Sequence, residues 1–337
     1  MTLVLGINGF GRLGRVLLRC VLSRSPDRDP VEVVAVNDPA DADSLAYLLE
    51  YDSTYGGLAQ PVRVRGRTLC VGDQRIQLTS AANPGEVDWR RAGADVVVET
   101  TGPASARRDA AAHLAAGARK VVVAAYHPRA DATIAVGIND DDYDPSSHHV
   151  VSAGSGTALC VAPMLLVLHR GFGVRHAALT SIHSYTGDQS LVDRPHRDPR
   201  RARSAAVNII PTATGAARAV GALLPELAGA VDAVAVRVPV EGGCLADLSV
   251  LVRSAVTPGQ VNRAFADAAA AGLAPLLRYT DAPVVSRDVV GSDASCVFDS
   301  RLSTTCAELV KVFGWHDNEW GYAHRLLALA ELVNPGG

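Results

Sequence analysis

A glycine-rich turn near the start of the chain has the residue types and spacing of a pyrophosphate-binding site. Gly9, Gly11 and Gly14 form the pattern G-x-G-x-x-G. In this pattern the first glycine permits a tight turn, the second lets the backbone approach a pyrophosphate, and the third lets a helix pack closely on a strand. The free amides at the start of that helix attract the anion. The residues expected to contact the cofactor here are Gly9, Phe10, Gly11, Arg12 and Leu13.

A carboxylate follows the next strand of the same unit. Asp38 stands after Asn37, about 24 residues beyond Gly14, where an acidic side chain binds the ribose hydroxyls of a dinucleotide. A carboxylate there favours NAD over NADP, because it repels the additional phosphate. Arg194 keeps NADP open, since an arginine reaching this site pairs either with that phosphate or with Asp38. We expect Asn37 and Asp38 to contact the cofactor.

Strands and helices that alternate along the N-terminal half would position these residues. Short apolar runs of strand type occupy residues 3–7, 31–36, 96–99 and 120–125, and an alanine-rich stretch over 104–116 predicts a helix. Alternation of this kind predicts a parallel sheet covered on both faces. Thr101 and Gly102 follow the third run, at the carboxyl edge where nucleotides bind. They are either cofactor contacts or a simple turn.

A series of ordered segments resembles the glyceraldehyde-3-phosphate dehydrogenase family over essentially the whole length. The matching segments are 6–12, 51–54, 152–163, 181–186, 208–212, 214–217, 237–239 and 315–322. The resemblance implies an α/β protein with an N-terminal Rossmann doubly wound parallel sheet and an α+β catalytic domain with a large mixed sheet. The NAD-binding domain would comprise residues 1–153 and 319–337, with a final helix over 323–333, and the catalytic domain residues 154–318.

The resemblance also assigns roles around the substrate. His183 resembles the family's base, and Thr186, Asp188 and Arg237 resemble its pocket for the substrate phosphate. Asn318 and Tyr322 resemble the residues that hold the nicotinamide. The second anion pocket, where inorganic phosphate attacks, would be formed by Ser155, Thr157, Thr214 and Gly215, and Gly156 belongs to the same segment. The family is normally a homotetramer, whose S-shaped loop, here about residues 188–203, lines a neighbour's cofactor site.

Gly156 stands where the family has its reactive cysteine, so the usual thiohemiacetal cannot form at that position. Polar residues of the same segment are also lost, at Ala153 and at Ala158 and Leu159. Two further segments, 124–126 and 240–244, differ from the family beside the nicotinamide and after Arg237. These departures together indicate long divergence.

Two cysteines and water are the candidate replacements for the nucleophile. Cys160 lies one helical turn beyond Gly156, away from the helix N-terminus that lowers a thiol pKa. Cys244 follows Gly242 and Gly243, which we expect to open space and to permit unusual backbone angles, and it begins a strand near Arg237. A thiolate there could be stabilised by Arg237 or by protonated His183. The alternative is that Cys244 is a small buried strand residue.

Bulk properties exclude several function classes. The chain has 337 residues, a net charge of -3, 48% hydrophobic residues and 20% charged residues. We expect no nucleic-acid partner, because this charge provides no attractive field. We expect no membrane anchor or leader, because no apolar run nears the ~20 residues of a span. The six cysteines are scattered without metal-ligand spacing, which predicts reduced thiols, no metal and a cytoplasmic location.

Two functions of different classes are consistent with these residues. The first is an NAD-dependent oxidoreductase for a phosphorylated or otherwise anionic aldehyde, with His183 as base and Cys244 or water as nucleophile, in a specialised pathway. The second is a non-catalytic NAD-binding pseudoenzyme. Loss of the thiol at Gly156 favours the second, while retention of His183, Arg237 and Asn318 favours the first.

Overall fold

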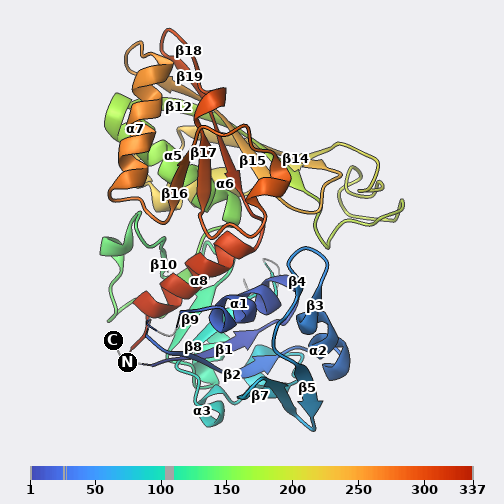
Figure 1. Cartoon of the computed structure of the whole chain (residues 1–337). Helices are drawn as coiled ribbons and strands as arrows, with labels where there is room; N and C mark the ends of the chain where they lie inside the picture. The colour runs from blue at the N-terminus through green and yellow to red at the C-terminus, as the bar shows by residue number, and fades with distance from the viewer. Residues whose placement is uncertain (1, 26, 28, 103–109, 336–337) are drawn as a thin grey trace. The chain divides into compact units, whose positions relative to one another are not determined.

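The computed structural model describes residues 2–25, 27, 29–102 and 110–335. The chain divides into two compact units (Figure 1). The first unit comprises Met1–Gly154 and Ala323–Gly337, and the second comprises Ser155–Tyr322. None of the helices in the described ranges is long and apolar enough to cross a lipid bilayer.

The first unit is built on a sheet in which nine strands are described, in the order β10-β11-β9-β8-β1-β2-β7-β6-β5. Every neighbouring pair from β10 to β7 is parallel, and β6 and β5 extend the edge in antiparallel fashion. The strands are β1 Leu3–Asn8, β2 Val31–Asn37, β5 Val62–Arg65, β6 Thr68–Val71, β7 Gln74–Thr79, β8 Val96–Glu99, β9 Lys120–Val123, β10 Ala132–Thr133 and β11 Val150–Ser152, with a separate hairpin of β3 Tyr51–Asp52 and β4 Gly56–Gly57. The predicted Rossmann sheet is confirmed.

Helices accompany these strands in the first unit. They are α1 Arg12–Leu22, α2 Ala42–Glu50, α3 Trp89–Ala92 and the end of α8 Trp320–Leu332, together with residues 110–115. The predicted helix over 104–116 is therefore helical in its second half, while residues 104–109 lie outside the described residues. Helix α1 follows β1 directly and contacts β2, as the glycine pattern requires.

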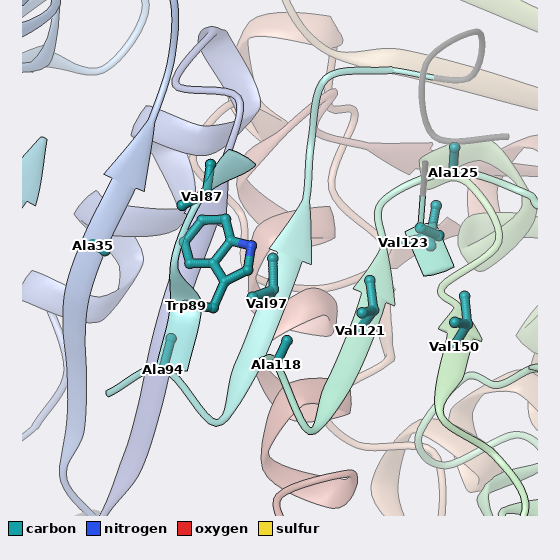
Figure 2. Close-up of a cluster of buried hydrophobic side chains, with 11 residues drawn as sticks. Ala35, Val87, Trp89, Ala94, Val97, Ala118, Val121, Val123, Ala125 and Val150 are labelled. Atoms are coloured by element: carbon teal, nitrogen blue, oxygen red, sulfur yellow. The ribbon is translucent and has the colours of Figure 1, made fainter. Parts of the chain in front are cut away.

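Small apolar side chains cover one face of this sheet around Trp89 (Figure 2). Val97 of β8 pairs with Val121 of β9, and Val150 continues the same layer from β11. Figure 2 shows the Trp89 ring lying beside Val97, over the middle of the sheet. Val97, Val121 and Val150 are β-branched, and β-branched side chains pack well on a pleated surface.

The second unit is built on a mixed sheet of eight strands among the described residues, in the order β13-β14-β12-β15-β19-β17-β16, with β18 also paired to β19. Pairs β12-β14 and β16-β17 are parallel, and the others are antiparallel. The strands are β12 Val174–Ser184, β13 Ile210–Ala213, β14 Val231–Val238, β15 Cys244–Val252, β16 Leu277–Thr280, β17 Cys296–Asp299, β18 Thr304–Cys306 and β19 Leu309–His316. The expected large mixed sheet is confirmed.

Three helices accompany this sheet, namely α5 Gly156–Phe172, α6 Ala216–Leu223 and α7 Pro258–Ala270 (Figure 1). Helix α5 is buried along most of its length and contacts β12, β15, β17 and β19. Short 3-10 turns complete the chain at Pro84–Glu86, Asp140–Asp142, Pro225–Leu227, Ser286–Val289 and Ser300–Leu302. The first residue of α5 is Gly156, which therefore lies at the N-terminus of a buried helix.

Candidate active site

The glycine turn of the first unit has the shape that a dinucleotide needs. Gly9 has a φ of +88°, which favours glycine, and a Cβ on Gly14 would lie 2.2 Å from the carbonyl oxygen of Gly9. No described atom lies within 4 Å of a Cβ built on Gly11, and no side chain caps α1. The first amides of α1 are therefore available to an anion. These features fit the pyrophosphate of a dinucleotide.

Asp38 is fixed against the glycine turn. Its Oδ2 accepts from the amide of Phe10 at 2.7 Å, and its Oδ1 accepts from the amide of Ala40 at 2.9 Å. A carboxylate has four acceptor sites, so both oxygens can still accept from ribose hydroxyls. Asn37, in contrast, is only 4% exposed. Its amide bonds to Asn8 and Ala81, so Asn37 holds the end of β2 in place instead of facing a ligand.

The remaining predicted contacts surround the same turn. Arg12 pairs with Asp52 at 3.2 Å, and its guanidinium lies 5.3 Å from the centre of the Tyr55 ring. Leu13 is half-buried beside it in α1. Thr101 is exposed at the carboxyl end of β8, and Gly102 follows with a φ of +103°. The edge of the sheet thus carries Thr101 close to Gly9, because a Cβ on Gly9 would lie 2.7 Å from the Thr101 methyl group.

A buried carboxylate that the sequence did not single out fixes this edge. Glu99 is 2% exposed and accepts from the amide of Thr101 at 2.6 Å and from Asn8 Nδ2 at 2.6 Å. His113 Nε2 lies 3.0 Å from Glu99, and Trp89 Nε1 donates to His113 Nδ1 at 2.9 Å. Burial by itself raises the pKa of Glu99, but hydrogen bonds from His113, Thr101 and Asn8 bring it below its ordinary value. Glu99 is therefore ionised inside the unit.

In the second unit, four polar side chains stand in one row across four neighbouring strands. His183 of β12 pairs with Arg237 of β14, and Cys244 of β15 pairs with His316 of β19. The register that pairs Ile182 with Leu245 sets His183 beside Cys244. Residues directly opposite one another share a face of the sheet. The row Arg237, His183, Cys244 and His316 is therefore continuous, and it is called the polar row below.

Arg237 and His183 contact each other within the polar row. His183 Nδ1 lies 2.8 Å from the carbonyl oxygen of Ser184, and Arg237 Nη1 donates to that carbonyl and to Thr186 Oγ1, each at 3.0 Å. Arg237 Nη1 also lies 3.1 Å from His183 Nδ1, but the carbonyl at 2.8 Å is the closer neighbour and only accepts. The proton of neutral His183 therefore lies on Nδ1, Arg237 approaches that nitrogen without donating to it, and Nε2 is an acceptor. Burial, the charge of Arg237 and His316 lower the pKa of His183 to about 3. His183 is therefore neutral near pH 7.

An acidic residue and a second arginine extend this cluster. Thr186 donates to Asp188, and Arg201 Nη1 pairs with Asp188 at 2.5 Å. Burial raises the pKa of Asp188, but the contacts with Thr186 and Arg201 bring it below its ordinary value. Arg201 was not among the residues predicted for this site. The structure brings Thr186, Asp188 and Arg237 together as the resemblance implied.

Asn318 and Tyr322 lie beside Gly156. A Cβ built on Gly156 would lie 3.6 Å from the carbonyl oxygen of Asn318 and 3.9 Å from Tyr322 Cβ, which are ordinary contacts. Ser155 caps α5 by accepting from the amide of Ala158 at 3.2 Å, and Thr157 is buried. Ser155 thus caps one of the first amides of α5, and position 156 beside it has room for a larger residue.

Both parts of the chain match models of one family. Residues 3–107 match the NAD binding domain of glyceraldehyde 3-phosphate dehydrogenase, and residues 155–318 match its C-terminal domain. The chain is 45% identical over 333 residues to glyceraldehyde-3-phosphate dehydrogenase 2 of Streptomyces arenae, covering 99% of each chain. It is 46% identical over 339 residues to glyceraldehyde-3-phosphate dehydrogenase of Geobacillus stearothermophilus, covering 100% of each. The chain belongs to the glyceraldehyde-3-phosphate dehydrogenase family.

In this member of the glyceraldehyde-3-phosphate dehydrogenase family, Cys244 has the environment of a structural residue. It is fully buried, and its thiol donates to Asn318 Oδ1 at 3.1 Å. Burial raises the pKa of Cys244, while hydrogen bonds to Ser184 and the charge of Arg237 lower it by less. The resulting pKa is about 12. The neighbouring Gly243 does have a φ of +80°, but a Cβ there would lie 2.0 Å from the Ser286 carbonyl oxygen. The expectation that the glycines open space beside Cys244 is therefore wrong at Gly243, where glycine allows close backbone packing.

Cys160 is also enclosed. It is fully buried on α5, and a Cβ on Gly314 of β19 would lie 3.3 Å from its sulfur and 2.7 Å from that of Cys296. Burial raises the pKa of Cys160 well above its ordinary value, and Cys296 contributes in the same direction. All six cysteines are free, and Cys306 is exposed. Neither Cys160 nor Cys244 is a thiolate near neutral pH in this environment.

Thr214 and Gly215 lie at the start of α6. Thr214 Oγ1 accepts from the amide of Ala216 at 3.2 Å, and Gly215 caps the helix without a side chain. The register pairs Ile210 with Arg237, so Thr214 follows four residues further along the chain, or about 13 Å. The structure therefore does not join Thr214 and Gly215 to Arg237 through contacts of the described residues. No cluster of metal-ligating side chains is found in the described ranges.

Proposed function

We propose that this member of the glyceraldehyde-3-phosphate dehydrogenase family oxidises a phosphorylated or otherwise anionic aldehyde to its acid, with NAD as oxidant and water as nucleophile. The observation that carries the proposal is the contact between Arg237 and His183, 3.1 Å from Nη1 to Nδ1, in a unit where Gly156 supplies no thiol. The raised pKa values of Cys244 and Cys160 favour water over either cysteine.

The residues around Arg237 support an anionic substrate. Arg237 Nε is buried and has no hydrogen-bond partner among the described residues, so the guanidinium keeps a donor for a ligand. Thr186 and Arg201 add a hydroxyl and a second cation beside it. A phosphate accepts several such donors at once, and arginine provides them in a planar fork.

His183 would act as the base. Water adds across the aldehyde C=O, forming one C–O bond and giving a hydrate, RCH(OH)2. His183 Nε2 takes the proton of one hydrate O–H while the C–H bond breaks with its electron pair, leaving RCOOH. When bound, NAD supplies the acceptor of that hydride and is reduced to NADH. The sum is RCHO + H2O + NAD+ → RCOOH + NADH + H+, followed by ionisation of the acid.

The low pKa of His183 fits a reaction in which the substrate anion binds before His183 removes a proton. Part of its lowering comes from the positive charge of Arg237, after burial. A phosphate bound to Arg237 offsets that charge, so the pKa of His183 rises when the anion arrives. General bases act best when their pKa lies near the working pH. Substrate binding would thus improve the base that acts on the same substrate.

The cofactor side of the proposal rests on the first unit. Gly9, Gly11 and the start of α1 would hold the pyrophosphate, and Asp38 the ribose hydroxyls. Asn318 and Tyr322 would hold the nicotinamide. Asp38 favours NAD, and Arg194 is the residue through which NADP would bind instead.

A homotetramer in the cytoplasm is part of the proposal. Large apolar side chains are exposed in and after the loop 188–203, and exposed apolar patches mark interaction surfaces. They are Leu191, Val192, Val207 and Ile209, each 70% exposed or more. The changed segments 124–126 and 240–244 favour a specialised pathway over central glycolysis.

The test follows NADH absorbance with NAD and glyceraldehyde 3-phosphate, with and without inorganic phosphate, and identifies the product. We expect phosphate-independent NADH and 3-phosphoglycerate, loss of at least about 100-fold in kcat in His183→Gln, and little change in Cys244→Ser, which keeps a donor for Asn318. Loss of activity in Cys244→Ser with an intact fold would instead support the relocated thiol. If the product is an acyl phosphate, the water route is wrong.

A second candidate function is NAD binding without catalysis. The specific observation that favours it is the enclosure of Cys244 and Cys160, since the chain then offers no ionised thiol near Gly156. NAD binding by calorimetry, without NADH from a panel of phosphorylated aldehydes, would select this candidate.

A further inference from the structure

His316 is a second buried imidazole in the polar row. It is 2% exposed, and its ring centre lies 6.2 Å from that of His183, with the ring planes at 77°. Cys244 of β15 lies between the two strands that carry these imidazoles. The described residues show no hydrogen bond between the two rings. Nδ1 of each ring lies near a backbone carbonyl oxygen instead.

The backbone sets the tautomer of His316. Its Nδ1 lies 3.1 Å from the carbonyl oxygen of Asp317, which only accepts. The proton of neutral His316 therefore lies on Nδ1, and its Nε2 is an acceptor, as it is in His183. Two acceptor nitrogens thus belong to neighbouring imidazoles of one site.

His316 Nε2 has no hydrogen-bond partner among the described residues although it is buried. A buried acceptor without a partner is destabilising, so such an atom normally bonds to water or to a ligand. None of the groups facing the two rings donates to it, and the unpaired Nε of Arg237 makes no hydrogen bond with it either. Asp317 and Asp188 are acceptors, Arg237 donates to Ser184 and Thr186, and Cys244 donates to Asn318.

We propose that His316 is a further catalytic residue, whose Nε2 accepts a hydrogen bond from the second hydroxyl of the aldehyde hydrate while His183 accepts from the first. A hydrate carries two O–H groups on one carbon, and the polar row offers two acceptor nitrogens from adjacent imidazoles. This inference rests on the proposed water route. Only His183 takes a proton, and the hydrogen bond from His316 orients the hydrate so that its C–H bond is free to release the hydride.

The kinetic test compares two substitutions. His316→Leu removes the acceptor, and His316→Gln keeps one, because the glutamine oxygen lies near the position of Nε2. We expect kcat to fall about 10–100-fold in His316→Leu, the loss of one hydrogen bond made in the transition state. We expect His316→Gln to stay within about fivefold of the unsubstituted protein. Exposed His176 on β12 provides the matched control, His176→Leu, with unchanged kcat.

A binding test separates this inference from the proposed function. Calorimetry without NAD, so that no turnover occurs, compares glyceraldehyde 3-phosphate, which forms a hydrate, with glycerol 3-phosphate, which has one hydroxyl on the same carbon. His316→Leu should weaken the first about tenfold and leave the second unchanged.

Equal weakening of both ligands would assign His316 a structural role and overturn the inference. Unchanged kcat in His316→Leu, or equal loss in the leucine and glutamine variants, would also overturn it. If neither ligand binds the unsubstituted protein, the proposed function itself fails, and this result is distinct from the others.

Discussion

The thiol of Cys244 hydrogen bonds to the side-chain oxygen of Asn318, with 3.1 Å between Sγ and Oδ1. The amide nitrogen of Asn318 donates to Ser184 Oγ. Both ends of the amide are thus fixed by residues of β12 and β15, which determines its orientation. Cys244 therefore serves in this structure as a donor that positions Asn318.

Thiol labelling should distinguish the buried cysteines from the exposed one. With a disulfide reagent at pH 7, we expect Cys306 to react quickly and Cys244 slowly, because only thiolates react and burial raises the pKa of Cys244 to about 12. Mass spectrometry of the labelled peptides makes the assignment, and Cys306→Ser should abolish the fast phase. A fast phase at Cys244 would contradict its structural role.

Gly156→Cys should introduce a reactive thiol. The Cβ fits, since its nearest neighbour would be the Asn318 carbonyl oxygen at 3.6 Å, and a thiol at a helix N-terminus has a lowered pKa. We expect rapid labelling of the introduced thiol in this variant and NADH formation that becomes dependent on inorganic phosphate.

Gly156→Ala is the control for the added thiol. It should fold with unchanged stability within about 0.5 kcal/mol and keep phosphate-independent NADH formation. If Gly156→Cys labels rapidly yet shows no phosphate dependence, the second anion pocket at Thr157 and Thr214 is not functional.

The stability of the protein should fall with acid partly through His183. Its pKa is lowered from 6.5 to about 3 on folding, so the unfolded chain binds more protons between these values. The stabilisation is complete above pH 6.5 and is lost as the pH falls toward 3. Each such group steepens the decline by at most about 1.4 kcal/mol per pH unit.

Urea unfolding from pH 7.5 to 4.5 measures this contribution. The difference in free energy of unfolding between the unsubstituted protein and His183→Gln should shrink as the pH falls. If the free energies of unfolding of the two proteins changed in parallel with pH, His183 would keep an ordinary pKa in the folded protein.

The two glycines of the N-terminal turn should separate folding from cofactor affinity. Gly14→Ala places a Cβ 2.2 Å from the Gly9 carbonyl oxygen and should destabilise the protein by roughly 2–4 kcal/mol. A Cβ on Gly11 meets no described atom within 4 Å, so Gly11→Ala should keep stability, and Gly11→Val adds bulk that should weaken NAD binding. Denaturation and NAD titration of these variants test this, and equal NAD affinity in Gly11→Val would remove Gly11 from the pyrophosphate site.

His113→Leu should destabilise the first unit. It leaves the ionised Glu99 with one donor fewer and Trp89 Nε1 without its acceptor, a loss of roughly 3 kcal/mol. Thermal unfolding measures it, with the exposed His176→Leu as a surface control expected to change little. A shift no larger than that of the control would mean that the Trp89, His113 and Glu99 chain contributes nothing to stability.

Regular patterns in the sequence predicted most of the fold. The strand over 96–99 is found as predicted, and the runs 3–7 and 31–36 each extend by one residue, because Asn8 and Asn37 complete the parallel ladder. Run 120–125 ends earlier, at Val123. The glycine spacing predicted both the turn and the helix after it, because both depend on residues that are close together in the sequence.

Long-range neighbours were harder to predict. Glu99 and His113 meet through a helix whose packing has no sequence signal, and Arg201 reaches Asp188 across a loop of thirteen residues. His316 lay within a segment that matched the family as a whole, so its position beside His183 emerged only from strand order. For Cys244 the alternative of a small buried strand residue is confirmed, because it shares the buried face of β15 with Ala246, Leu248 and Val250.

The polar row and the residue at position 156 belong to different elements, the sheet and helix α5. The two parts meet through neighbours such as Asn318, which lies beside Gly156 and bonds to Cys244. A substitution at position 156 and a substitution in the polar row can therefore be made and studied one at a time, since no single element carries both.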